Sequence, residues 1–126
     1  MNILNISPIP ASRPRFSKYG TYNTSKYSNY KKSLSIMLKQ IHKTQIENQC
    51  RLTIKFYLPI PKMSKKKTEE HIGMYHYKKP DLDNLLKGFM DAANGIVYKD
   101  DNIVSSIIAE KYYCDKPRIE YSVMEL

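Results

Sequence analysis

The chain has 126 residues, 41% of them hydrophobic, and a net charge of +9. This length fits one domain with its own core, so we expect residues 1–126 to fold as a single domain. No apolar run approaches the roughly 20 residues of a membrane helix, the first residues lack the order of a signal peptide, and two distant cysteines indicate a reducing cytoplasm rather than a disulfide framework.

Charge is divided unevenly along the chain. Residues 1–79 carry 16 Lys or Arg and 3 Asp or Glu, whereas residues 80–126 carry 5 and 9. The first part therefore has a net charge of +13 and the second a net charge of −4. This division favours a polyanion partner for the first part and a cation for the second, while a lysine-rich surface that only faces water is the alternative.

The N-terminal residues 1–7 predict a short strand, which two prolines end. A basic and aromatic stretch follows, and its cations are Arg13, Arg15 and Lys18. Guanidinium groups bind phosphate through two hydrogen bonds and aromatic rings stack on exposed bases, so we predict DNA contacts here. The alternative is a hairpin whose aromatic rings pack on the core.

The middle of the chain predicts one helix and one strand. The helix has Thr24 or Ser25 as its cap and runs to about Glu47, with an apolar stripe at spacings of three and four. Its lysines fall mostly off that stripe and either line DNA or face water. Residues 50–58 alternate between apolar and polar side chains, which predicts a strand whose buried face consists of Leu52, Ile54, Phe56 and Leu58.

Residues 61–79 are basic and lack apolar periodicity, which predicts a long loop. We expect this loop to contact DNA through its cations, the predicted contacts being Lys65, Lys66, Lys67, Lys78 and Lys79. Its two histidines, His71 and His76, have no cysteine or histidine partner at ligand spacing. They are expected at the surface rather than at a zinc site.

Residues 80–95 predict a second helix, opened by Pro80 and ended by Gly95 just past the cap. Its apolar face is expected to consist of Leu82, Leu85, Leu86, Phe89 and Ala93. A turn follows at residues 99–102. Residues 103–113 and 118–124 then predict two strands that pair as an antiparallel hairpin.

Residues 79–101 hold five of the twelve acidic residues, all of them aspartate. Asp81 and Asp83 stand where extended chain turns into helix, and Asp100 and Asp101 follow the helix. If the chain after the helix folds back beside its start, at least three carboxylates meet, and Mg²⁺ or Mn²⁺ would relieve their repulsion. Such an ion activates water and offsets charge on a scissile phosphate.

Lys87 lies one helical turn beyond Asp83, and it either orients that carboxylate or stabilises the phosphate in the transition state. Each of these charges also has a purely structural interpretation. An aspartate at a helix start stabilises the helix by about 0.5–2 kcal/mol. Asp83, Lys87 and Asp91 are spaced as an exposed ion-pair ladder, and the later aspartate pair is also typical of a turn.

The string KPDLDNLLKGFMDAANGIVYKDDNIV resembles the signature of the RusA family of endodeoxyribonucleases, the phage-type Holliday junction resolvases. In that family an Asp-x-Asp-Asn-x-x-Lys motif opens a helix and an Asp-Asp pair follows it. The likeness is continuous over these 26 residues. The upstream RPRF segment and the two C-terminal strands also fit, so the resemblance extends over the whole chain.

The resemblance implies a homodimer that cuts four-way DNA junctions symmetrically with Mg²⁺, during recombination and repair in the cytoplasm of a bacterium or a phage host. It implies no small-molecule cofactor. The metal ligands and catalytic acids would be Asp81, Asp83 and Asp101. Lys87 has an essential basic role, and the acids of open role are Asp91 and Asp100.

With the elements above, the resemblance predicts an α+β fold in which two main helices accompany a small mixed sheet of four to five strands. Two other functions remain open on the residues alone. One is a non-catalytic DNA-binding phage regulator, for which the basic segment argues equally well. The other is a structural or assembly protein whose acids are helix caps and surface pairs.

Overall fold

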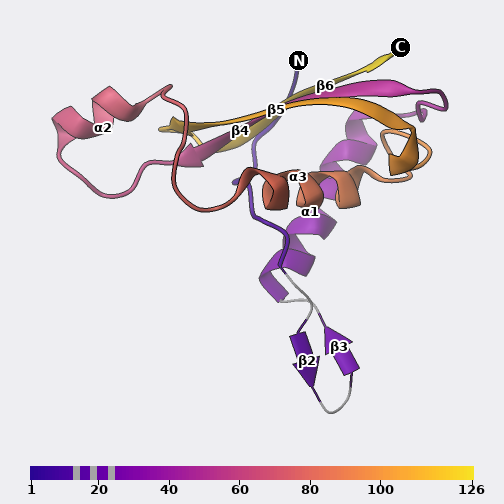
Figure 1. Ribbon diagram of the computed structural model, residues 1–126, viewed down its shortest axis with the longest axis horizontal. Coiled ribbons are helices and arrows are strands. Elements are labelled where there is room, and N and C mark those ends of the chain that lie inside the picture. The colour runs from indigo at the N-terminus through magenta and orange to yellow at the C-terminus, as the bar shows by residue number, and fades with distance from the viewer. Residues whose placement is uncertain (13–14, 18–19, 23–24) are drawn as a thin grey trace.

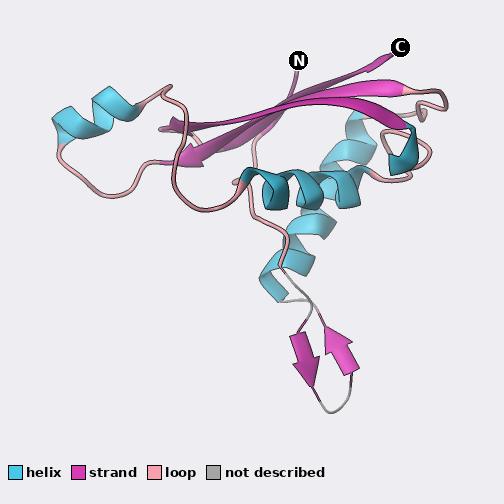
Figure 2. Ribbon diagram, viewed as in Figure 1, coloured by secondary structure: helices cyan, strands magenta, loops and turns pink. Residues whose placement is uncertain are grey.

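The computed structural model describes residues 1–12, 15–17, 20–22 and 25–126 (Figure 1). Its elements in chain order are β1 (Asn2–Leu4), β2 (Arg15–Ser17), β3 (Gly20–Tyr22), α1 (Ser25–Ile41), β4 (Cys50–Pro59), α2 (Lys65–His71), α3 (Leu82–Ala93), a 3₁₀ turn η1 (Asp101–Ile103), β5 (Val104–Cys114) and β6 (Arg118–Glu125). The predicted α+β fold, with α1 and α3 as its two main helices, is confirmed (Figure 2). None of the described helices is long and apolar enough to cross a membrane.

The main sheet has the strand order β1-β6-β4-β5. β4 pairs in parallel with β5 and antiparallel with β6, so the sheet is mixed. A small antiparallel hairpin of β2 and β3 projects away from it (Figure 1).

The predicted hairpin between the two C-terminal strands is wrong, because β4 lies between β5 and β6. The side chains of β4 that face the helices are all buried, so the centre of the sheet suits this strand. The short link from Cys114 to Arg118 is still long enough to step over β4. Four residue steps span up to about 14 Å, and two strand spacings amount to about 10 Å.

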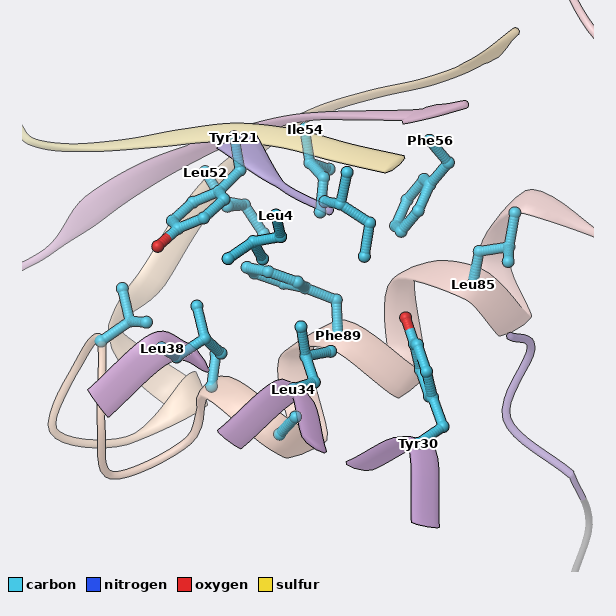
Figure 3. Packing of buried hydrophobic residues seen from close by; sticks show 14 of the residues in the cluster. Leu4, Tyr30, Leu34, Leu38, Leu52, Ile54, Phe56, Leu85, Phe89 and Tyr121 are labelled. Carbon is cyan, nitrogen blue, oxygen red and sulfur yellow. The ribbon is translucent and has the colours of Figure 1, made fainter. Parts of the chain in front are cut away.

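The hydrophobic core lies between the sheet and the two main helices, which cover the same face of the sheet (Figure 1). Leu52, Ile54 and Phe56 of β4 point into this layer, as the alternation predicts, and they are fully buried. Phe89 of α3 and Leu34 of α1 meet them from the helix side (Figure 3). The opposite face of the sheet has no helix over it within the described residues (Figure 2).

Both main helices are shorter than predicted. α1 ends at Ile41 rather than near Glu47, because the following backbone pairs elsewhere: Ile46 N–H donates to Val97 O at 3.0 Å, and Lys99 N–H donates to Ile46 O at 2.8 Å. α3 begins at Leu82, with Asp81 as its N-cap residue in extended conformation, rather than at Pro80. Its predicted end is confirmed, since Gly95 adopts a positive φ of 77° just past the cap.

The prediction of a continuous loop at residues 61–79 is wrong, because this segment contains helix α2. Ser64 caps α2 by accepting a hydrogen bond from Lys67 N–H at 3.3 Å. The surface position predicted for His76 is also wrong: its ring packs on Tyr113, with ring centroids 4.4 Å apart, and it is buried. Besides the cap, several ring contacts with Tyr112 and Tyr113 and backbone hydrogen bonds to β5 hold this segment, although it lacks apolar periodicity.

We expect Phe89→Ala to lower the free energy of unfolding by about 3–5 kcal/mol, because it would leave a cavity in the centre of the core. Ile36→Ala is the matched control, since Ile36 is 59% exposed on α1. Its effect should stay within about 0.5 kcal/mol. Urea denaturation followed by circular dichroism measures both, and similar losses in the two variants would contradict this description of the core.

Candidate functional site

The start of α3 presents two carboxylates to solvent. Asp81 is the N-cap residue, but its side chain makes no capping hydrogen bond within the described part of the chain. Asp83 lies in the first turn, where its Oδ1 accepts a hydrogen bond from Asn84 N–H at 3.0 Å. Both residues are exposed. The side chain of Asp81 therefore does not cap the helix. Its carboxylate oxygens are available to a ligand.

The backbone that leads to Asp81 is held by a lysine of the sheet. The Nζ of Lys111, on β5, donates to the carbonyl oxygens of Lys78 at 2.6 Å and Pro80 at 2.8 Å. These contacts fix the chain directly before the first carboxylate to the edge strand. Sequence reasoning missed Lys111, because it is 30 residues from Asp81 and no motif spacing links the two.

A groove of about 770 Å³ opens beside Asp81. Its walls combine apolar side chains of the N-terminal segment and the end of β4 with six polar side chains: Ser7, Ser12, Lys26, Lys79, Asp81 and Asn84. Lysine and carboxylate thus share one concave surface. A phosphate backbone could lie along such lysines while its sugar and base face the apolar wall.

The C-terminal end of α3 carries a second charged group. Asp91 forms an ion pair with Lys87 at 3.4 Å and accepts a hydrogen bond from the Tyr27 hydroxyl at 3.2 Å. Partial burial, together with the negative charge of Asp91, raises the pKa of Tyr27 to about 12. Of the two ion pairs predicted among Asp83, Lys87 and Asp91, the structure confirms the one between Lys87 and Asp91. Lys87 therefore points toward the end of α3 rather than back to Asp83.

Asp100 and Asp101 lie in the turn that leads into β5. Asp101 N–H donates to the side-chain oxygen of Asn94 at 2.9 Å, which fixes this turn to the end of α3. A hydrogen bond with Asp100 raises the pKa of Asp101, and the negative charges of Asp100 and Asp91 raise it further, whereas Lys87 lowers it. The carboxylates of Asp91 and Asp100 therefore both act on Asp101 at this end of the helix.

The two groups of acids lie at opposite ends of α3. Ten residues separate Asp81 from Asp91, which amounts to about 15 Å along a helix axis. Asp101 belongs to the Asp91 end, and Figure 1 shows the chain near residue 100 beyond the C-terminal end of α3. Among the described residues, no three acidic, histidine or cysteine side chains are grouped to hold a metal ion. The fold-back considered above is not made within one chain, and the assignment of Asp81, Asp83 and Asp101 to a metal stays a prediction.

The predicted DNA contacts are scattered over the molecule. Lys65, Lys66 and Lys67 lie on α2, which projects past the sheet at the end where α3 begins (Figure 1). Lys79 lines the groove beside Asp81, and Lys78 lies over the ring of Tyr77 at 5.7 Å. Arg13 and Lys18 fall outside the described residues, and of Arg15 only the backbone, in β2, is described.

A second groove, of about 570 Å³, runs beside Asp91. Lysines of α1 line it together with small side chains, the lysines being Lys31, Lys32 and Lys39. The sequence left open whether the lysines of this helix face DNA or only water. The structure places three of these lysines in one groove together with Asp91. The spacing of positions 31, 32 and 39 along the helix is the sequence signal that could have indicated this shared face.

We expect Asp100→Asn to lower the pKa of Asp101, because the amide removes a negative charge and donates a hydrogen bond to the ionised carboxylate. Lys87→Met should move the pKa of Asp101 in the opposite direction, since Lys87 favours the charged form. Carboxyl chemical shifts followed by NMR over a pH titration measure both shifts. Identical titration curves in the two variants would show that these groups do not act on Asp101.

Two comparisons with known proteins agree with this arrangement. The chain matches the family described as Endodeoxyribonuclease RusA over residues 5–124. It is also 32% identical, over 129 aligned positions, to a protein of Bacillus subtilis (strain 168) described as "Uncharacterized protein YqaN". That alignment covers 94% of this chain and 91% of the relative. The match spans both groups of acids and the strands β4, β5 and nearly all of β6, and the chain belongs to the RusA family of endodeoxyribonucleases.

Proposed function

We propose that this protein is a metal-dependent endonuclease that cuts branched DNA, resolving Holliday junctions by paired symmetric nicks in recombination and repair. The observation that carries the proposal is the start of α3. There Asp81 and Asp83 are exposed, Lys111 holds the backbone before them, and a lysine-lined groove opens beside Asp81. In a chain of an endodeoxyribonuclease family, this is a surface to which a phosphodiester could be brought.

Mg²⁺, or Mn²⁺ in its place, suits the donors that this chain offers. Carboxylate oxygens are the ligands these ions prefer, and we assign them to Asp81, Asp83 and Asp101. The hydrogen bond with Asp100, followed by the negative charges of Asp100 and Asp91, raises the pKa of Asp101, and a dication beside these carboxylates would offset their charge. When bound, the ion would lower the pKa of water and offset the charge that develops on the phosphate.

Lys87 is the cation that we assign to the phosphate in the transition state. Its side chain is 65% exposed, and its partner Asp91 holds it at the surface of α3. An exposed ion pair of this kind contributes little to stability, so the lysine can exchange Asp91 for a phosphate oxygen at small cost. In this proposal Asp91 positions Lys87 and is not a metal ligand.

The distance between the two groups of acids along α3 bears on how many protein chains contribute to one active site. Asp81 and Asp101 lie at opposite ends of a helix within one chain, so they can serve the same ion only if two chains contribute to each site. Paired cuts in two strands also require two sites. We therefore propose a homodimer that acts in the cytoplasm of a bacterium or of a phage host.

A non-catalytic DNA-binding regulator is the second candidate, and the two lysine-lined grooves favour it as much as the first. Both functions give affinity that falls steeply with salt, because lysines that contact phosphates release bound counterions. Only cleavage separates them. A regulator would bind junction DNA with every aspartate substitution and release no product in the presence of Mg²⁺ or Mn²⁺.

We expect wild-type protein to nick a labelled four-way junction in Mg²⁺ and not in EDTA. Asp81→Asn, Asp83→Asn and Asp101→Asn should each slow cleavage by about a hundredfold or more and leave junction binding intact, because a lost ligand removes charge stabilisation at the reacting phosphate. Asp115→Asn is the matched control, since Asp115 is exposed in the β5–β6 link and lies in neither acid group. Wild-type rates in Asp81→Asn would exclude the proposed site.

A mixture of two inactive variants tests whether the site is shared. If each site takes Asp81 from one copy and Asp101 from the other, a mixed dimer of Asp81→Asn with Asp101→Asn contains one doubly substituted site and one intact site. We expect such a mixture, refolded together, to recover single-strand nicking that neither variant shows alone. No recovery in a mixture proved to contain mixed dimers would place both ligands in one chain.

A further inference from the structure

We propose that the ring of Tyr75 binds an unpaired base of the DNA substrate by stacking, close to the phosphate that the carboxylate of Asp81 serves. The inference rests on the proposed function for the position of that phosphate. The stacking site itself follows from the ring contacts, hydrogen bonds and exposure of Tyr75.

A row of stacked side chains crosses the face of the main sheet that the helices leave uncovered. Tyr57 of β4 and Tyr112 of β5 are register partners, and their ring centroids lie 5.4 Å apart. Arg118 of β6 lies over the Tyr57 ring, with its guanidinium carbon 3.9 Å from the centroid. Tyr75, in the segment after α2, stacks on Tyr112 with centroids 4.9 Å apart. The row therefore begins at Arg118 and ends at Tyr75.

Tyr75 is held in place although most of its side chain faces solvent. Its backbone forms a bridge with Tyr112, and its hydroxyl donates to Glu110 Oε2 at 2.9 Å. Tyr75 is nevertheless 64% exposed. Among the described residues, no second ring and no cation lies over it. Because Glu110 contacts only the hydroxyl, one flat face of a fixed ring is open to a further π-system.

The charges around Tyr75 favour DNA as the ligand. Residues 62–79 carry six lysines and two glutamates. Lys78 and Lys79 are exposed directly after the ring, and three more lysines lie on α2, which projects past the sheet (Figure 1). Proteins that hold single-stranded nucleic acid combine cations along the phosphates with aromatic rings under the bases. The segment that carries Tyr75 offers both.

The position of Tyr75 suits a base near the reacting phosphate. Six residue steps separate Tyr75 from Asp81, which span at most about 20 Å. His76 N–H donates to Lys111 O at 2.9 Å, and Lys111 Nζ donates to Pro80 O at 2.8 Å, so β5 holds both ends of this stretch. One strand of B-DNA advances about 3.4 Å per nucleotide. A base within about six nucleotides of a phosphate at Asp81 therefore reaches the ring.

Stacking on Tyr75 would make the protein selective for branched DNA. Inside a duplex both faces of each base are covered by neighbouring bases, so none is open to the ring. At a branch point the bases have lost a stacking neighbour, and in a single strand they unstack at small cost. Every base has a π-face, so the ring recognises the branch rather than a sequence.

Binding measured in EDTA, where the proposed cleavage does not occur, tests the stacking site. Fluorescence anisotropy is followed with a labelled four-way junction, a single-stranded oligothymidylate and a linear duplex. Tyr75→Ala should raise the dissociation constants of the junction and of the single strand by about tenfold, and that of the duplex by less than about twofold. The slope of affinity against salt should not change, because no phosphate contact is lost.

Three further variants separate the π-face of Tyr75 from its other contacts. Tyr75→Phe keeps the ring and should bind as wild type does. Tyr75→Leu keeps apolar bulk over β5 without a flat ring, so it should bind as weakly as Tyr75→Ala. Met74→Ala is the matched control, since Met74 is the preceding residue and is 44% exposed. Wild-type affinity in Tyr75→Leu, or an equal loss for the linear duplex, would overturn the proposal.

A photochemical cross-link gives a second readout in the unaltered protein. Junctions that carry 5-iodouracil at single positions within about six nucleotides of the branch point are irradiated in the complex. The proposal expects a cross-link at one or more of these positions, which mass spectrometry of the peptides maps to Tyr75 and which is lost in Tyr75→Leu. Cross-links that map only to other residues would place the unpaired base elsewhere.

The stacking site and the proposed activity can fail separately, because neither the affinities nor the cross-link requires cleavage. A protein that binds junctions through Tyr75 and cuts nothing in Mg²⁺ would leave the stacking site standing and refute the nuclease. A protein that cuts junctions and binds them equally well with Tyr75→Leu would do the reverse.

Discussion

The burial of one face of α3 is the constraint on which the rest of the structure depends. Phe89 is fully buried and packs on Tyr121 of β6, with ring centroids 5.1 Å apart, and Leu85 and Ala93 continue the same apolar face. Gly88 completes the fit, because a Cβ there would lie 3.2 Å from the carbonyl oxygen of Ile9. A helix held this closely has no freedom to rotate, so the direction of its outward charges is fixed by its core.

Because the apolar face of α3 is buried, the charged side chains of this helix lie at the protein surface and not in the core. Asp83 and Lys87 leave the helix on the side opposite Phe89, and Asp91 follows them at its margin, where Tyr27 reaches it. The lysine-lined grooves flank the helix at both ends because α1 and the N-terminal segment pack beside it. The same packing of α3 thus positions the lysines that could attract a polyanion and the carboxylates that could bind a cation.

The elements with strong local patterns were predictable from the sequence. The alternation of β4 fixed its buried face, and the apolar spacing of α3 with Gly95 at its end fixed that helix to within two residues at its start. The partners of the strands were not predictable, because a three-residue link permits both a direct hairpin and a step over β4. α2 was missed, since a seven-residue helix with no buried side chain leaves no apolar period.

For the site, the sequence indicated the acidic residues but not their distances. The motif placed Asp81 and Asp83 at a helix start, as the structure has them. Whether Asp101 approaches them depends on where the chain runs after Gly95, and no local pattern encodes that path. Lys111 was invisible for the same reason: its contacts with Lys78 and Pro80 exist only because β5 passes beside the segment that enters α3.

The strand order has a consequence for how the chain acquires its fold. β6 is the last strand in the sequence, yet it lies between β1 and β4, so Leu4 finds its partner Ile119 only after nearly the whole chain has been made. Pairings this distant in sequence form slowly, since a long segment must close before any contact is gained. On the ribosome β4 therefore keeps one edge unpaired until β6 has emerged. The order in which the strands are synthesised thus delays closure of the sheet until β6 is available.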